Sequence, residues 1–175
     1  MKKQQLILKN HQEVHDKISI NAQLEIYDKT IIINFKIEGE VDNYIFPLPS
    51  KQKRGHELWK ATCFELFLGY NNQTEYQEIN ISPLAEWNHY SFTNYRKDLK
   101  ENLTELNPLI KTLKTKESYS ISFESDFEER IIKNKLIFNL AVILLDHQGT
   151  RHFYTINRKE KEVNFHLKKQ WNSFL

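Results

Sequence analysis

The chain has 175 residues, of which 39% are hydrophobic and 13% aromatic, and its formal net charge is +2. This length suits a single domain, residues 1–175, with its own hydrophobic core. The small net charge argues against nucleic acid or an anionic membrane as a partner. A single cysteine, Cys63, excludes an intramolecular disulfide. No apolar run reaches the length of a secretory or membrane-spanning segment, so we expect a cytoplasmic protein.

Alternation of apolar and polar residues, the pattern of half-buried strands, dominates the N-terminal third. It predicts strands over residues 18–26 and 30–37, joined by a short loop. Residues 41–49 are predicted to be an edge strand or a loop, because Pro47 and Pro49 have no backbone N–H to donate.

The remainder of the chain continues as short strands separated by turns. Strands are predicted at residues 59–69, 75–81, 86–92, 109–114, 118–124, 135–145 and 151–156. Residues 94–107 are expected to hold a short helix or a loop, and residues 126–132 have the pattern of a helix start. The tail, 162–175, is expected to pack as a closing strand. About ten strands with little helix predict an all-β fold, a two-sheet antiparallel β-sandwich of the jelly-roll kind.

Two neighbouring strands carry polar groups on one face each. Glu65 lies on the first strand, and Tyr76, Glu78 and Asn80 share a face of the second. A short turn at residues 71–73 makes the strands partners, so coinciding polar faces would form one cluster. Carboxylate and amide groups bind sugar hydroxyls, and aromatic rings pack against the sugar's C–H face. The alternative is an ordinary solvated sheet face.

An aromatic-rich stretch follows this pair of strands. Trp87 and Tyr95 are candidate stacking walls, and Arg96 is a candidate fork donor to hydroxyls or a carboxylate. The alternative interpretation, which we favour for Tyr90 and Phe92, is that the aromatic residues belong to the core.

Several motifs stand in a fixed order between residues 54 and 96. They are Arg54, then Leu-Trp-Lys-Ala-Thr-Cys-Phe-Glu-Leu-Phe at 58–67, Tyr-Gln-Glu-Ile-Asn-Ile-Ser-Pro at 76–83, Trp-Asn-His-Tyr-Ser-Phe at 87–92, and Tyr95-Arg96. This succession resembles the DOMON-like domains, in particular the bacterial stand-alone group similar to a domain associated with UDP-N-acetylmuramate dehydrogenase. The later Asn164-Phe165-His166 resembles that group's closing Asp-Phe-His, with Asn in place of Asp.

The resemblance implies a β-sandwich related to family 9 carbohydrate-binding modules and to haem-binding cytochrome domains, with the ligand in a pocket on one sheet. In the sugar-binding relatives the acidic residue of the Glu-x-Phe strand lies in this pocket, and Glu65 matches it. The other positions that match recurring residues of the group are Arg54, Trp59, Glu78, Asn80, Trp87, Tyr95 and Arg96. We therefore expect a non-catalytic domain that binds a small ligand, most simply a sugar, without a metal or a resident cofactor.

Haem binding is one alternative function. Met1 is the only methionine, so two histidines would have to serve as axial ligands. The candidates are His56, His89, His147, His152 and His166.

An enzyme and a protein-interaction module are further alternatives. No complete catalytic motif is present: His11 and His15 depart from the His-Glu-x-x-His pattern of zinc enzymes. Glu65 and Glu78 would be the carboxylate pair if the domain hydrolysed glycosides. An interaction module would use an exposed sheet edge. The sequence also leaves open whether Arg54 and Arg96 line a pocket or form structural ion pairs.

Overall fold

The computed structural model describes residues 2–11, 17–103, 106–127, 135–157 and 162–174. These residues form an all-β fold whose helical turns include short 3-10 segments at Val41–Asn43, Leu58–Lys60 and Lys168–Gln170. Within the same ranges, no helix has the length and apolar character needed to cross a membrane.

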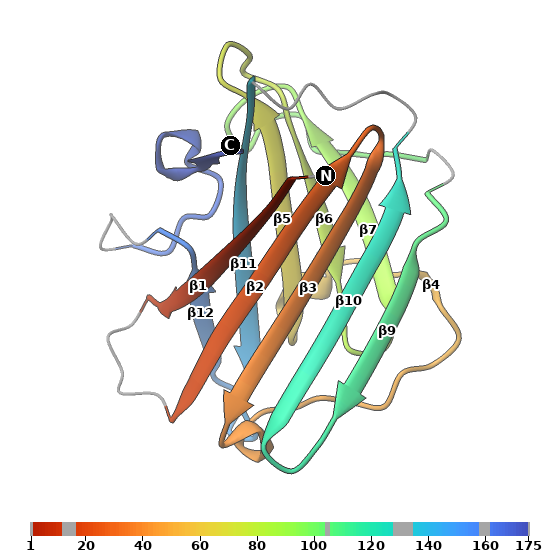
Figure 1. The fold of residues 1–175 in the computed structure, drawn as a ribbon, viewed down its shortest axis with the longest axis vertical. Coiled ribbons are helices and arrows are strands. Elements are labelled where there is room, and N and C mark those ends of the chain that lie inside the picture. Colours follow the sequence, from red (N-terminus) through yellow and green to blue (C-terminus); the bar gives the residue numbers. More distant parts are fainter. Residues whose placement is uncertain (1, 12–16, 104–105, 128–134, 158–161, 175) are drawn as a thin grey trace.

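Thirteen strands make up the sheet structure of the described residues (Figure 1). They are β1 (Lys2–Asn10), β2 (Ile18–Tyr27), β3 (Thr30–Gly39), β4 (Lys53–Arg54), β5 (Cys63–Tyr70), β6 (Tyr76–Ile81), β7 (Glu86–Phe92), β8 (Lys100–Glu101), β9 (Leu109–Lys114), β10 (Ser118–Asp126), β11 (Leu136–Leu145), β12 (Arg151–Thr155) and β13 (Asn172–Ser173). Their order is β4-β7-β6-β5-β11-β12-β1-β2-β3-β10-β9, with β8 beside β7 and β13 beside β11. All pairs are antiparallel except β4 with β7.

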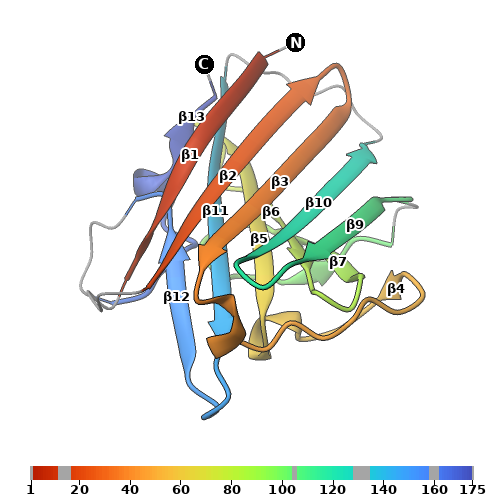
Figure 2. The same ribbon diagram turned by 60° about the horizontal axis from the view of Figure 1, so that its bottom comes forward.

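One continuous sheet curls so that its two halves face each other (Figure 2). Strand β1 joins the halves, because it pairs with β2 over most of its length and with β12 through Lys9 and Asn10. The all-β prediction is confirmed, but the two separate sheets expected from the sequence are replaced by one curled sheet. The sequence pattern did not predict β1. By pairing with both halves it covers two strand edges that would otherwise be exposed.

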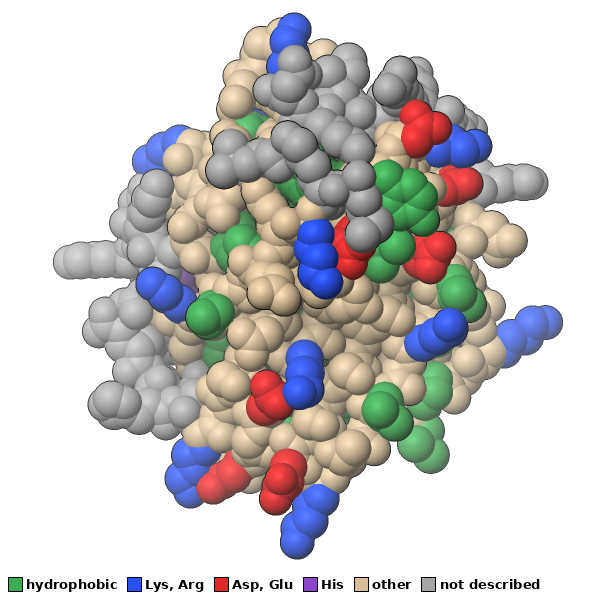
Figure 3. All heavy atoms as spheres, viewed as in Figure 1, with side chains coloured by type: hydrophobic (Ala, Val, Ile, Leu, Met, Phe, Trp, Pro, Cys, Tyr) green, Lys and Arg blue, Asp and Glu red, His purple; other side chains and the backbone are tan. Residues whose placement is uncertain are grey.

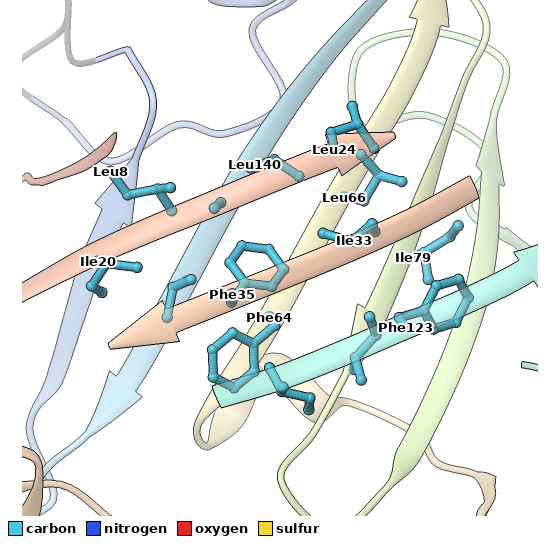
Figure 4. Packing of buried hydrophobic residues seen from close by; sticks show 14 of the residues in the cluster. Leu8, Ile20, Leu24, Ile33, Phe35, Phe64, Leu66, Ile79, Phe123 and Leu140 are labelled. Carbon is cyan, nitrogen blue, oxygen red and sulfur yellow. The ribbon is translucent and has the colours of Figure 1, made fainter. Parts of the chain in front are cut away.

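The main core lies between the two halves (Figure 4). Leu24, Ile33 and Phe35 from one half point towards Phe64 and Leu66 from the other, and the rings of Phe35 and Phe64 lie 5.2 Å apart. These positions alternate with polar ones along β2 and β3, so the period of two in the sequence correctly predicted the buried face.

A second apolar cluster covers the opposite face of β5, β6, β7 and β11, which we call the outer face. Phe165 and Trp171 of the C-terminal segment, residues 162–174, pack there against Phe67. The tail was predicted to be a closing strand, but only β13 pairs with β11, at the end of β11 that β12 leaves free. The rest of the segment packs through its side chains.

Other predicted elements shift at their ends or lie elsewhere. The strand predicted from residue 59 begins at Cys63, because Leu58–Lys60 form a 3-10 turn after Glu57, whose φ is +54°. Residues 94–107 contain the short β8 but no described helix. Asp126 ends β10 rather than capping a helix, and the remainder of the helix predicted there, 128–132, lies outside the described residues, as does His15.

Candidate functional site

The polar side chains of β5 and β6 share the outer face of the sheet. In the strand register, Glu65 pairs with Asn80 and Phe67 pairs with Glu78. Partners in an antiparallel pair point to the same side, so both carboxyl groups and the Asn80 amide stand together. The coincidence of polar faces predicted from alternation is therefore present in the fold.

This face is buried rather than solvated. Glu65 is 3% exposed, Glu78 is 5% exposed and Asn80 is fully buried. Burial raises the pKa of Glu78 to about 7, while a hydrogen bond from Asn80 and the charge of Arg96 pull it down. Burial, followed by the charge of Glu78, raises the pKa of Glu65 well above its usual range. Near neutral pH the carboxyl pair consequently retains a proton that two exposed glutamates would lose.

The nitrogen of the Asn80 amide forms a hydrogen bond, whereas its oxygen has no partner among the described residues. Its Nδ2 donates to Glu78 Oε1 over 2.8 Å. Its Oδ1 is buried and has no hydrogen-bond partner among the described residues. A buried amide oxygen without a partner is costly, and such a group marks a place where a ligand or a water molecule is expected to donate a hydrogen bond.

The C-terminal segment closes one end of the site through His166. The ring of His166 packs edge-on against Phe67, Tyr76 and Phe92. Its Nδ1 lies 2.7 Å from the Tyr76 hydroxyl, which also accepts the backbone N–H of Arg96. Its Nε2 lies 3.8 Å from Glu78 Oε2. Burial, helped by the charge of Arg96, lowers the pKa of His166 to about 3, so the imidazole is neutral.

The tautomer of the neutral imidazole sets the direction of the contact with Tyr76. Where the Tyr76 hydroxyl donates to Nδ1 of His166, the ring proton is on Nε2, on the side of Glu78; in the other tautomer Nδ1–H donates to the Tyr76 oxygen. In both tautomers His166 presents a neutral ring nitrogen, not a cation, to the carboxyl pair.

Aromatic and charged side chains form the rim of the site. Trp59 is half-buried and meets Tyr90 edge-on at 5.9 Å. Tyr95 is 43% exposed, and its hydroxyl accepts a hydrogen bond from Asn164 Nδ2. The guanidinium of Arg96 lies 5.9 Å from the centre of the Tyr95 ring. Of the two predicted stacking residues, Tyr95 therefore lies at the surface of the rim, and Trp59, a position that matched the family, lies half-buried beside Tyr90.

Arg54 and Trp87 lie apart from this cluster. Trp87 pairs with Ile81, which places its side chain on the core side of β7, and it is 5% exposed. The guanidinium of Arg54 stacks 4.4 Å from the Trp87 ring. Arg54 also donates to Asn88 Oδ1 over 2.9 Å and lies 3.5 Å from Glu101. Arg54 therefore has structural partners at the edge of the sheet and lies outside the cluster of Glu65 and Glu78.

Sequence reasoning passed over two residues of the outer face. Asn88 pairs with Asn80 and uses its Nδ2 on the carbonyl of Gly55. Alternation along β7 would have identified it, since Asn88 and Tyr90 occupy one face. His166 was noted only in a closing motif and as a haem candidate. The position of His166 beside Glu78 depends on the path of the C-terminal segment, and no local sequence pattern predicts that path.

A separate hollow opens on the core side of β6 and β7, with a volume of about 630 Å³. His89 lines it, and its Nε2 lies 3.1 Å from Gln77 Oε1 and 3.0 Å from the Asn102 amide nitrogen. Burial lowers the pKa of His89 to about 4. Leu68 and Phe127 form part of the apolar wall. The sequence did not predict this hollow. The sheet separates His89, Gln77 and Leu68 from Glu65 and Glu78, while Tyr76 and Phe92 of the outer face also contribute to the lining.

On the face drawn in Figure 3, acidic and basic side chains are interspersed among the coloured residues. Among the described residues, no group of three or more His, Cys, Asp or Glu side chains is placed to hold a metal ion.

Comparison with known proteins rests on structure. No family model matches the chain, and no curated protein matches it. A candidate carbohydrate-binding protein from Bacteroides uniformis ATCC 8492 is 11% identical, with a TM-score of 0.70, over 98% of this chain and 84% of that one.

Two further structures are of a family 9 carbohydrate-binding module from Caldicellulosiruptor kristjanssonii. The complex with cellotriose is 15% identical, with a TM-score of 0.53, over 88% of this chain and 72% of that one. The complex with glucose is 14% identical, with a TM-score of 0.52, over 95% and 79% of the two chains. At these identities the likeness concerns the fold, so the chain shares the all-β architecture of these carbohydrate-binding structures.

Proposed function

We propose that this domain binds a carbohydrate, without transforming it, at the outer-face cluster of Glu65, Glu78 and Asn80. One observation carries the proposal: these polar groups are buried together among aromatic side chains, and the Asn80 oxygen lacks a partner among the described residues. The shared fold with modules solved in complex with glucose and cellotriose supports a sugar as the ligand. The motif order supports the narrower assignment to the DOMON-like, sandwich-type domains.

The proposed contacts follow from the chemistry of each group. Glu65, Glu78 and Asn80 Oδ1 would accept hydrogen bonds from sugar hydroxyls. Trp59 and Tyr95 would pack against the C–H face of the ring at the rim. Arg96 would donate to a hydroxyl or to the ring oxygen.

Isothermal titration calorimetry against a panel of mono- and disaccharides tests the proposal. Glu65→Gln keeps the shape of the side chain and replaces one carboxyl oxygen by an amide nitrogen, which cannot accept a hydrogen bond, so we expect at least a tenfold loss of affinity, which corresponds to about 1.4 kcal/mol. Glu124→Gln is the matched control, because Glu124 is exposed on β10 in the other half of the sheet. The control is expected to bind as tightly as the unchanged protein.

Two outcomes would replace this function. Release of a shorter sugar during incubation, abolished by Glu78→Gln, would make the carboxyl pair the acid and base of a glycosidase. Equal binding by Glu65→Gln and the unchanged protein would move the site elsewhere, the hollow beside His89 being the first place to look.

Haem binding finds less support in the placement of the histidines. The two most buried candidates, His89 and His166, lie on opposite faces of the β6–β7 pair, so they do not face one iron. A Soret band that appears on adding haem to the purified protein, and is lost in His166→Ala, would restore this alternative.

A further inference from the structure

Most polar side-chain atoms of the outer-face cluster are oxygens that can accept hydrogen bonds. Two carboxyl groups, Glu65 and Glu78, supply four oxygens, and Asn80 adds an oxygen without a partner. The donor side of the Asn80 amide is already engaged by Glu78. Sugar hydroxyls bring acceptors as well as donors, so a ligand made only of hydroxyls matches this composition incompletely.

The titratable groups around the cluster supply little positive charge. Each element packed against it contributes the following groups: Cys63 from β5, Tyr76 from β6, Tyr90 from β7, Arg96 from the loop after β7, and His166 from the C-terminal segment. The thiol and both phenols are neutral near pH 7, since burial raises the pKa of each of them. His166 is neutral as well, because burial lowers its pKa. Arg96, at the exposed rim, is thus the one cation among these groups.

Two ionised carboxylates with one arginine leave one negative charge uncompensated. In the free protein a retained proton neutralises it, because desolvation makes a second buried carboxylate costly. A cationic group on the ligand would take the place of that proton. An ammonium group has three N–H donors and no acceptor, which complements Glu65, Glu78 and Asn80 Oδ1 together.

We infer that the preferred ligand is a sugar carrying a free primary amine, held as an ammonium ion between Glu65, Glu78 and the Asn80 oxygen. This inference rests on the proposed function. Acetylation of the amine would remove its charge and two of its three donors. The site is therefore expected to discriminate amino sugars from both their N-acetylated forms and the parent hexoses.

Calorimetry with glucosamine, N-acetylglucosamine and glucose provides the test. We expect glucosamine to bind at least tenfold more tightly than either neutral sugar. Because the ammonium displaces a proton from the carboxyl pair, binding near pH 6 should release about one proton per sugar. The measured enthalpy should accordingly vary with the ionisation enthalpy of the buffer for glucosamine and stay constant for any neutral sugar that binds.

Variants separate this site from non-specific attraction of a cation. Glu78→Gln should lower the affinity for glucosamine at least tenfold more than it lowers the affinity for glucose, and it should reduce the proton release. Glu124→Gln, which removes an equal charge elsewhere, should change none of these values.

The two proposals fail differently. Glucose or N-acetylglucosamine binding as tightly as glucosamine, with no proton release, would overturn the amino-sugar inference and keep the carbohydrate site. No binding by any of the three sugars or by the wider panel would overturn the carbohydrate function itself.

Discussion

The Tyr76 hydroxyl lies 2.7 Å from Nδ1 of His166, and this contact ties β6 to the C-terminal segment beside the carboxyl pair. The same hydroxyl accepts the backbone N–H of Arg96. A single oxygen atom therefore links three parts of the chain that are distant in sequence. The arrangement of the site depends on this link, and the predictions below begin with it.

Tyr76→Phe should loosen the closure of the site without disturbing the aromatic packing. It leaves the His166 nitrogen and the Arg96 N–H without their partner, which we expect to cost about 1–3 kcal/mol of unfolding free energy. Urea denaturation measures the loss, and calorimetry should show weaker sugar binding. Tyr27→Phe is the control, because Tyr27 is exposed on β2. A Tyr76→Phe protein as stable as the control would show that the contact contributes nothing.

The Glu78 carboxyl should make stability depend on pH. Its pKa is raised from 4.5 to about 7 in the folded protein, so the folded state binds more protons than the unfolded state between these values. Its contribution is therefore fully present below pH 4.5 and is lost as the pH rises through 7. The loss is at most about 3 kcal/mol, since a tenfold change in proton affinity corresponds to about 1.4 kcal/mol.

Denaturation of the unchanged protein and of Glu78→Gln across this pH range isolates the effect. His166 and His89, whose pKa values are lowered, contribute the opposite slope, but they contribute it to both proteins. We expect Glu78→Gln to gain stability relative to the unchanged protein as the pH rises from 5 to 8. A constant difference between the two would mean that Glu78 ionises like an exposed glutamate.

Trp87 and Trp59 should respond differently to truncation. Trp87→Ala removes a buried ring beneath the Arg54 guanidinium and should cost about 3–5 kcal/mol of stability. Trp59→Ala removes a half-buried ring at the rim and should instead weaken sugar binding about tenfold, with a smaller loss of stability. Melting temperatures and calorimetry on both variants check the contrast, and the reverse pattern would place Trp87 in the ligand site.

Lys168 should anchor the C-terminal segment to the β5–β6 turn. Its ammonium donates to the carbonyls of Gln73 and Glu75, at 2.8 and 2.9 Å, and reaches that of Tyr70. Lys168→Met keeps the chain length but removes these donors, and we expect a loss of about 1 kcal/mol. Lys51→Met, at an exposed loop position, is the comparison in the same denaturation experiment. Equal stability of the two variants would argue against the anchor.

The local sequence was sufficient for most of the strands and for one face of the site. A period of two depends only on which side chains are apolar, so it correctly predicted the ends of β7 and β9 and the shared face of Tyr76, Glu78 and Asn80. The short turn between β5 and β6 then sufficed to bring Glu65 opposite Asn80.

Other features were decided by contacts between distant segments. Strand β1 joins the halves of the sheet because β2 and β12 each have a free edge with which it pairs. Apolar and polar residues alternate too weakly in the sequence of β1 to predict this strand. The side of β7 on which Trp87 lies followed from strand register rather than from its neighbours in the chain. Burial of the carboxyl pair, and with it the raised pKa values, required the C-terminal segment to carry His166 onto β6. Alternation predicts which residues share a face. The pKa values on that face depend on desolvation, which is determined by the segments that the rest of the chain packs over it.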